Sequence, residues 1–251
     1  MQSYLLTVAY DGRAYAGWQR QDGFDTIQQR LEEAFQMLVG EPVVVYGAGR
    51  TDAGVHALRQ CAHVRLPEAR STSELVAALN GNIPRDIAVQ SVRSVPAEFH
   101  ARFSARGKRY LYRFASSDIR PVIAKGFYHW LRRPVDIELM RAGARHLVGR
   151  HDFASFANNP GYERKRGTVR HVQRLHVIRR PAGVDMVIQG DGFLYNMVRA
   201  VAGTLRDVGW GKYPPEHVGA ILRARDRGAA GATLEPGGLY LARVLYPAAA
   251  L

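Results

Sequence analysis

Short strand-like runs alternate with amphipathic helical runs along this chain of 251 residues, and the alternation occurs twice. Strands are predicted at 4–9, 42–47, 60–66, 87–95, 108–114, 171–179, 184–189 and 239–245. Helices are predicted at 26–40, 71–79, 136–147, 194–205 and 218–222. The two series meet near residue 105. We therefore predict an α+β fold of two similar α/β halves, residues 1–105 and 106–251, with a ligand cleft between them.

Helix boundaries are predicted from capping residues. Thr26 with Gln29 and Ser71 with Glu74 have the spacing of capping boxes, and Asp136 is a third N-cap candidate. Gly40 is expected to end the first helix, and the pair at 80–81, Asn-Gly, to end the second.

The loop at 49–57 is the strongest candidate for chemistry. It follows an apolar run at 43–46, which predicts a buried strand, and it contains Arg50 and Asp52 between glycines. A cation near a carboxylate favours its ionised form, so Asp52 suits a nucleophile or a base. The alternative is an ordinary turn, in which Asp52 bonds only its own backbone. Neither a dinucleotide fingerprint nor a phosphate-binding P-loop matches.

The chain is strongly basic, with 35 Lys+Arg against 22 Asp+Glu, a net charge of +13 and a pI near 10.3. This charge predicts a polyanionic partner, most often a nucleic acid, and a basic cleft. The basic residues are nearly all arginine, which suits RNA but also follows from codon bias or a hot habitat.

Composition also limits the chemistry. Cys61 is the only cysteine, which excludes an internal disulfide, and it is expected to be a small buried apolar residue. No histidine or acidic cluster has metal-ligand spacing, so no metal and no cofactor are expected. No signal peptide or membrane-spanning segment is predicted, and we expect a cytoplasmic protein.

Two side chains of the second half are candidates for the cleft. Arg199 is expected on a helix, four residues after Tyr195 and off the apolar face, as a partner for Asp52. Tyr110 lies in an alternating strand among cations, where its ring can stack on a base. The alternatives are a solvated arginine and a half-buried strand tyrosine.

Three further segments are candidates for RNA contact. One joins the halves and contains Phe99, His100, Ala101, Arg102 and Phe103, but an apolar staple made by Phe99 and Phe103 is equally consistent. A second is the basic loop Arg164, Lys165, Arg166, Gly167 and Thr168. The third, at 10–20, combines aromatic and basic residues and is also consistent with a packed turn.

The run at 49–56, Gly-Arg-Thr-Asp-Ala-Gly-Val-His, resembles the active-site motif of the tRNA pseudouridine synthase A family. Other family motifs follow in order over nearly the whole chain, at 10–12, 17–19, 99–105, 149–153, 192–199 and 238–241. Arg59 and Ala232 stand where Gly and Pro are expected, and Asn196 where some members have His.

The resemblance implies conversion of uridine to pseudouridine at positions 38, 39 and 40 of the tRNA anticodon stem-loop, without cofactor or metal. It implies two ferredoxin-like or RRM-like halves fused through a largely antiparallel sheet, and a homodimer. Asp52 matches the catalytic aspartate, Tyr110 the base-contacting tyrosine, Arg50 the arginine linked to base flipping and Arg199 the cation beside the aspartate. The rival hypotheses are a non-catalytic RNA-binding module and an N-glycosidase that releases uracil.

Overall fold

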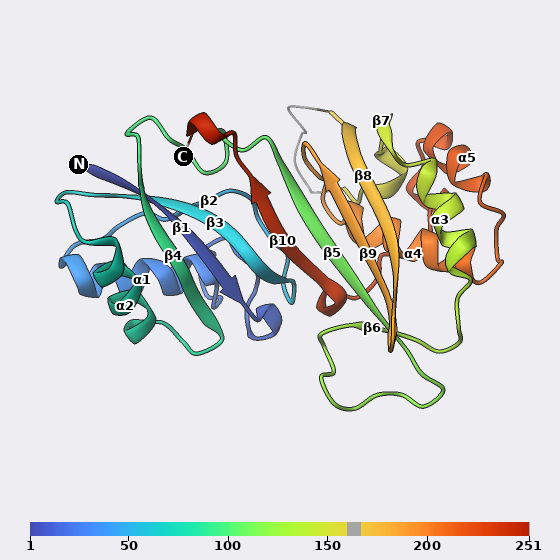
Figure 1. Ribbon diagram of the computed structural model, residues 1–251, viewed down its shortest axis with the longest axis horizontal. Helices are drawn as coiled ribbons and strands as arrows, with labels where there is room; N and C mark the ends of the chain where they lie inside the picture. The colour runs from blue at the N-terminus through green and yellow to red at the C-terminus, as the bar shows by residue number, and fades with distance from the viewer. Residues whose placement is uncertain (160–166, 251) are drawn as a thin grey trace. The chain divides into compact units, whose positions relative to one another are not determined.

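Antiparallel strand pairs and packed helices make up the fold (Figure 1). The structure is a computed structural model, and it describes residues 1–159 and 167–250. The chain divides into two units, Met1–Lys108 with Tyr240–Leu251 and Arg109–Leu239. The mixed α/β class with mostly antiparallel pairing is confirmed. The ferredoxin-like likeness of two halves and the basic cleft stay predictions.

Unit 1 contains a sheet whose central strands are paired antiparallel. Its strands lie in the order β4 (Ile87–Val95), β1 (Gln2–Tyr10), β3 (His56–Leu66) and β10 (Leu239–Leu245). β10 pairs parallel with β3, at Tyr240 beside His56. The short strand β2 (Tyr46–Gly47) also pairs with β3. Helices α1 (Ile27–Val39) and α2 (Thr72–Asn82) pack together on one face of this sheet (Figure 1).

Helix α1 forms as its sequence predicts. The Thr26 hydroxyl accepts a hydrogen bond from the Gln29 amide at 3.4 Å, and Gly40 ends the helix in the left-handed region, with φ at 82°. The apolar face with Ile27, Leu31 and Phe35 is fully buried. The Gln29 side chain donates from its Nε2 to Glu33 Oε1 at 2.8 Å, one turn further along the helix.

Three expectations in unit 1 are wrong. The second capping box does not form, because the Ser71 side chain makes no cap hydrogen bond to α2 and its hydroxyl lies 2.8 Å from the Ser73 hydroxyl instead. The predicted strand at 42–47 is reduced to β2. The backbone of Val45 bonds to side chains of α1 and not to a neighbouring strand: its amide donates to Glu32 Oε1 and its carbonyl accepts from Gln28 Nε2. Helix α2 continues through Asn80 and ends at Asn82. The Asn80 amide bonds both backbone groups of Val89 at 2.9 Å, which fixes Asn80 inside the helix.

Unit 2 repeats the combination of an antiparallel sheet and covering helices. Its strands lie in the order β5 (Gly107–Ser116), β9 (Gly183–Gly190), β8 (Val169–Arg180) and β7 (Gly149–Asp152), and β6 (His129–Leu131) pairs parallel with β5. Helix α3 (Ile137–Arg145) packs on β8, and α4 (Met197–Gly209) and α5 (His217–Ala224) pack on α3. As predicted, Asp136 caps α3 through its Oδ1.

Helix α4 is buried along most of its length, and it begins later than expected. Its first residue is Met197, so Tyr195 precedes the helix and the expected helical pair of Tyr195 and Arg199 is wrong. The cause is Asn196, whose backbone is left-handed with φ at 61°. Within α4, a Cβ at Gly203 would lie 2.0 Å from the Ala232 carbonyl oxygen, so only glycine permits this close packing.

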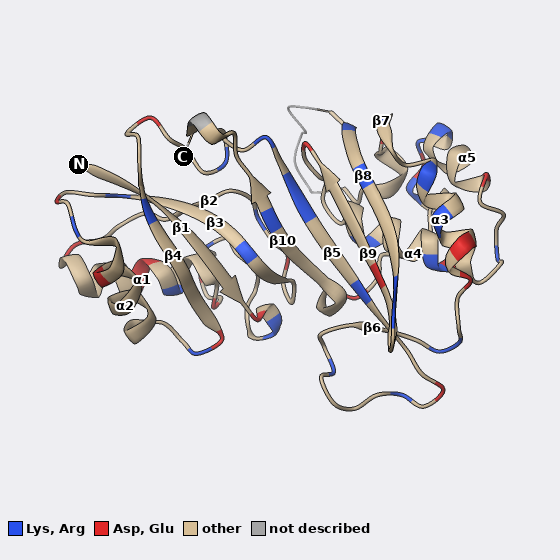
Figure 2. Ribbon diagram, viewed as in Figure 1, with Lys and Arg blue, Asp and Glu red and all other residues tan. Residues whose placement is uncertain are grey.

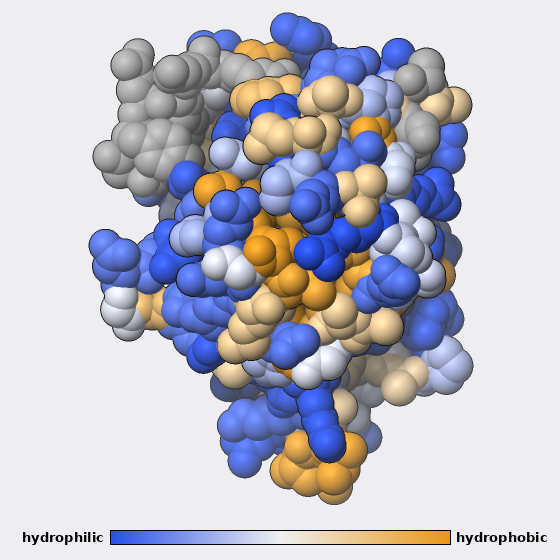
Figure 3. Space-filling model, turned by 90° about the vertical axis from the view of Figure 1, so that its left-hand side faces the viewer, coloured by the Kyte–Doolittle hydropathy of each residue, from blue (hydrophilic) through white to orange (hydrophobic). Residues whose placement is uncertain are grey.

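Basic residues are spread over strands as well as loops. Figure 2 shows Lys and Arg on β5, β8 and β10, and the face drawn in Figure 3 is largely hydrophilic with a few apolar areas. Among the residues that the structure describes, no helix is long and apolar enough to cross a bilayer. Within the same residues, no group of three His, Cys, Asp or Glu side chains is arranged to hold a metal ion.

Candidate active site and RNA-contact residues

Hydrogen bonds hold the loop at 49–56 on both sides of Asp52. Before it, the Thr51 carbonyl accepts from the Trp18 amide at 3.1 Å and the Thr51 hydroxyl lies 2.8 Å from the Tyr10 hydroxyl. After it, the Val55 amide donates to the Asp52 carbonyl at 3.1 Å, and Gly54 supplies a left-handed turn with φ at 76°. Asp52 itself is half-buried. The backbone therefore holds one carboxylate in a fixed, partly accessible position.

A buried tryptophan packs against the chain next to this loop. Trp18 is 1% exposed, and a Cβ at Gly47 would lie 2.4 Å from its indole nitrogen. Gly17, at φ 98°, passes so close that a Cβ there would lie 2.5 Å from the Thr51 carbonyl oxygen. Gly17 and Trp18 are therefore packed against the loop, whereas Arg20, at the end of the same segment, is exposed.

Two further residues hold the loop, and sequence analysis missed both. Gln60 is fully buried, and its amide donates to the Gly49 carbonyl at 2.9 Å. A Cβ at Gly49 would lie 2.5 Å from Lys108 Nζ, so the ammonium packs directly against the loop. A polar residue inside an apolar strand pattern was the available signal for Gln60. No sequence signal connects Lys108 to residue 49.

Arg50 and His56 differ in their surroundings. Arg50 is exposed, and its Nε donates to Gln19 Oε1 at 3.2 Å, which ties the motif at 17–19 to the loop. His56 is 1% exposed; its Nδ1 accepts from the Gly12 amide at 3.2 Å and its ring stacks on Tyr240 at 4.8 Å. Arg50 is thus accessible to a ligand, whereas His56 packs the sheet.

Cys61 is a buried apolar residue, as the sequence predicts. Its exposure is 7%, and burial raises the pKa of its thiol to about 11. The thiol therefore stays protonated near neutral pH and is a poor nucleophile.

In unit 2, Tyr110 and Arg199 are each held by specific contacts. Tyr110, on β5, is 8% exposed, and its ring makes a T-shaped contact with Phe193, with centroids 5.0 Å apart. Arg199 is half-buried on α4; its Nε donates to the Leu234 carbonyl at 2.6 Å and its Nη1 to Asn196 Oδ1 at 2.8 Å. These bonds fix the guanidinium, which excludes a freely solvated arginine.

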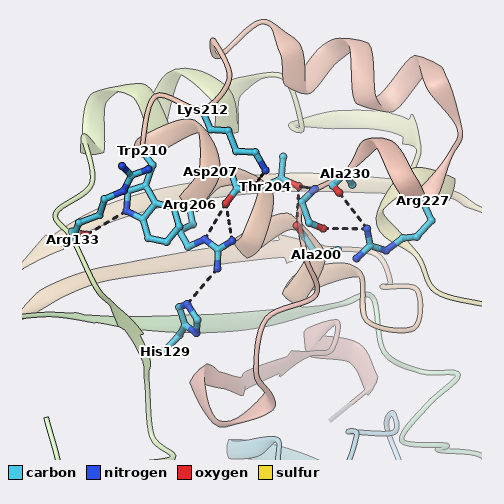
Figure 4. Close-up of polar contacts among 11 residues, drawn as sticks. His129, Arg133, Ala200, Thr204, Arg206, Asp207, Trp210, Lys212, Arg227 and Ala230 are labelled. Atoms are coloured by element: carbon cyan, nitrogen blue, oxygen red, sulfur yellow. Dashed lines mark hydrogen bonds and ion pairs between the residues drawn. The ribbon is translucent and has the colours of Figure 1, made fainter. Parts of the chain in front are cut away.

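The other end of α4 carries a buried acid, seen in Figure 4. Asp207, 4% exposed, accepts from Arg206 at 2.7 Å and from Lys212 at 3.2 Å. The Arg206 guanidinium also lies 4.6 Å from the Trp210 ring, which Arg133 contacts at 4.8 Å. This network fixes the C-terminal turn of the helix that bears Arg199.

The segment at 99–103 divides into buried and exposed residues. Phe99 is 3% exposed and packs against His63 and Tyr246, whereas Phe103 is 76% exposed. An apolar staple made by both phenylalanines is therefore wrong. Ala101 is buried and Arg102 is exposed.

The basic loop is described only at its end. Gly167 is exposed and its carbonyl accepts from Arg170 at 3.2 Å, and Thr168 is partly buried. Arg164, Lys165 and Arg166 lie outside the described residues.

Comparison with known proteins gives the family. The family model for tRNA pseudouridine synthase matches residues 6–104 and 144–247. The chain belongs to this family. The tRNA pseudouridine synthase A of Rhodospirillum rubrum is 43% identical over 98% of this chain and 88% of its own length. The enzymes of the same name from Coxiella burnetii and Caldicellulosiruptor bescii are 40% and 38% identical over 98% of this chain, and over 94% and 100% of their own lengths.

Membership in the tRNA pseudouridine synthase family makes the protein a tRNA-modifying isomerase, as its sequence motifs predicted. The first matched segment contains the loop with Asp52, and the second contains Arg199. Tyr110 lies between the two matched segments.

Proposed function

We propose that this tRNA pseudouridine synthase modifies uridines 38, 39 and 40 of the anticodon stem-loop, with Asp52 as the nucleophile. The observation that supports this role of Asp52 is the way its loop is held. Hydrogen bonds of Thr51 and Val55 fix the backbone on either side, while Asp52 stays partly accessible. Preorganised groups of this kind need no rearrangement at the moment of reaction. The net charge of +13 supports a polyanionic substrate.

The proposed reaction breaks one bond and makes another on the same nucleoside. The target base leaves the stack, at a cost of a few kcal/mol. Asp52 attacks either the uracil ring or the sugar carbon C1′, and the bond from N1 to C1′ breaks. The base rotates, its C5 bonds to C1′, the C5 proton goes to solvent and N1 gains a proton. Asp52 is released unchanged, so the atoms balance without an added reactant.

Three other residues have proposed roles. Arg50, which is an exposed residue of the loop, fills the space that the flipped base vacates. Tyr110 contacts the extruded uracil, and Arg199 keeps the aspartate ionised, because an adjacent cation favours a carboxylate. In this scheme residues 1–105 supply Asp52 and residues 106–251 supply Tyr110 and Arg199.

The remaining proposals concern binding and assembly. We propose tRNA contacts by the segment with Phe99, His100, Ala101, Arg102 and Phe103 and by residues 164–168. A homodimer, a cytoplasmic location and catalysis without cofactor complete the proposal.

The test is release of tritium from tRNA labelled at C5 of uridine. Wild type is expected to release tritium to water from a tRNA with uridine at 38, 39 and 40, and a transcript with cytidine at all three positions releases little. Asp52→Asn is expected to fold, to bind tRNA and to release none. Asp22→Asn, which removes an exposed acid of the same unit, is the matched control and retains wild-type release.

Other outcomes would reject parts of the proposal. Free uracil among the products would make the protein an N-glycosidase. Full activity of Asp52→Asn would leave Asp52 with a turn role only. Unchanged release from the cytidine transcript would place the modified uridines elsewhere in tRNA.

A further inference from the structure

Four rings of unit 1 contact one another in a row that ends at the surface. Tyr46 stacks on His63 with centroids 4.9 Å apart, His63 meets His100 at 4.5 Å, and His100 meets Phe103 at 4.4 Å. The inner ring, His63, is 1% exposed, whereas Tyr46 is 44% and Phe103 is 76% exposed. We call these four side chains the ring row.

The turn that carries Phe103 is held rigidly. The His100 amide donates to Ser104 Oγ at 3.1 Å and the Ser104 amide donates to the His100 carbonyl at 2.9 Å. The Ala101 amide donates to His63 Nδ1 at 3.2 Å, and the Tyr246 hydroxyl donates to the Ala101 carbonyl at 2.7 Å. The exposed phenylalanine is therefore preorganised. Its ring adds little to the core, because most of its apolar surface faces water.

The charges around the ring row are mainly positive. The Arg102 guanidinium lies 5.7 Å from the centre of the Phe103 ring. Burial lowers the pKa of both His63 and His100, and the positive charge of Arg65 lowers both further. Glu98 is the only acid between residues 96 and 106, against Arg102 and Arg106. An exposed aromatic face among arginines is the combination that binds an unpaired base and its phosphate.

We propose that the ring row is a stacking site for an unpaired nucleobase of the bound tRNA, with Phe103 offering its face and Arg102 contacting the adjacent phosphate. The site rests on the proposed function, because tRNA is the occupant. It takes a nucleotide other than the one isomerised. β3 joins the two places: Gln60 holds the Asp52 loop at Gly49, and His63 lies three residues further, about 10 Å along an extended strand.

The test measures tRNA binding directly, so it does not depend on catalysis. Phe103→Ala and Phe103→Leu are both expected to raise the Kd for tRNA about tenfold, because both remove the flat face. Phe103→Trp is expected to keep the affinity, and its indole fluorescence should be quenched when tRNA binds. Ile119→Ala, which truncates a side chain that is 84% exposed on a loop of unit 2, is the matched control with unchanged Kd.

Salt separates stacking from charge. The loss in Phe103→Ala should be equally large at about 0.1 and 0.3 M salt, since stacking is not ionic, whereas Arg102→Gln should lose its effect at the higher salt. Wild-type affinity of Phe103→Leu would overturn the proposal in favour of simple apolar contact. A changed sedimentation coefficient of Phe103→Ala without RNA would overturn it in favour of a protein interface. If wild type binds tRNA but makes no pseudouridine, the proposed function fails and the stacking site does not.

Discussion

The hydroxyl oxygen of Tyr10 lies 2.8 Å from the hydroxyl oxygen of Thr51, so the last residue of β1 holds the residue immediately before Asp52. Both side chains are buried, at 5% and 6% exposure. Burial raises the pKa of Tyr10 to about 12, so its hydroxyl keeps the proton at every pH at which the enzyme can be assayed. The contact therefore holds the loop independently of pH.

Tyr10→Phe removes this hydrogen bond and leaves the ring in place. We expect the free energy of unfolding to fall by about 1 kcal/mol, because a buried hydroxyl of Thr51 loses its partner. The loop backbone is also less fixed, so kcat for tRNA should fall several-fold with little change in KM. Urea unfolding and steady-state tritium release measure the two effects. A wild-type kcat at a lowered stability would show that the contact serves the fold alone.

Gly17→Ala tests the close approach beneath the loop. A Cβ at residue 17 would lie 2.5 Å from the Thr51 carbonyl oxygen, and the backbone there has φ at 98°. We expect a loss of about 3 kcal/mol or more in unfolding free energy and a large loss of kcat. Gly23→Ala is the matched control, since φ is 78° but no atom lies within 4 Å of its Cβ. Equal losses in both variants would show that backbone strain, and not the contact with Thr51, is responsible.

Asp207→Asn tests the buried network of α4. The variant leaves the cations of Arg206 and Lys212 facing a neutral group, and we expect a loss of about 3 kcal/mol in unfolding free energy. Lys212→Met removes the more exposed partner, whose side chain is 55% exposed, and should cost less than about 1 kcal/mol. Chemical denaturation of the two variants gives the comparison. Similar losses in both would contradict a dominant role for the Arg206 pair.

Local signals predicted the elements that depend on local interactions. Thr26 and Gly40 bound α1 as predicted, and the strand at 239–245 is β10 without a shift. Prediction failed where a polar group forms its hydrogen bonds with a residue that is distant in the sequence. The backbone of Val45 is hydrogen-bonded to side chains of α1, so the predicted strand is shorter. The side-chain amide of Asn80 is hydrogen-bonded to the backbone of Val89 on β4, so the helix is longer than predicted.

The candidate site shows the same contrast between local signals, which a sequence contains, and contacts between distant residues, which it does not reveal. The glycine-rich run identified the loop of Asp52, because turn residues are visible in a sequence. The groups that fix the loop include Tyr10, Trp18, Gln60 and Lys108, which come from other parts of the chain. Their contacts are non-local, and a single sequence contains no periodicity that would connect them.

His63 predicts a loss of stability in acid. Burial, followed by His100 and Arg65, lowers its pKa from 6.5 to about 4, and the ring must stay neutral because Nδ1 accepts from the Ala101 amide. Between these pH values the unfolded chain binds a proton that the folded protein does not, so the unfolding free energy decreases as the pH falls. We expect His63 to contribute a loss of about 2 kcal/mol between pH 7 and pH 5. His63→Asn keeps an acceptor near Nδ1 and does not titrate, so urea unfolding should show a shallower pH dependence by this amount. An identical slope in both proteins would mean that the pKa of His63 does not differ between the folded protein and the unfolded chain.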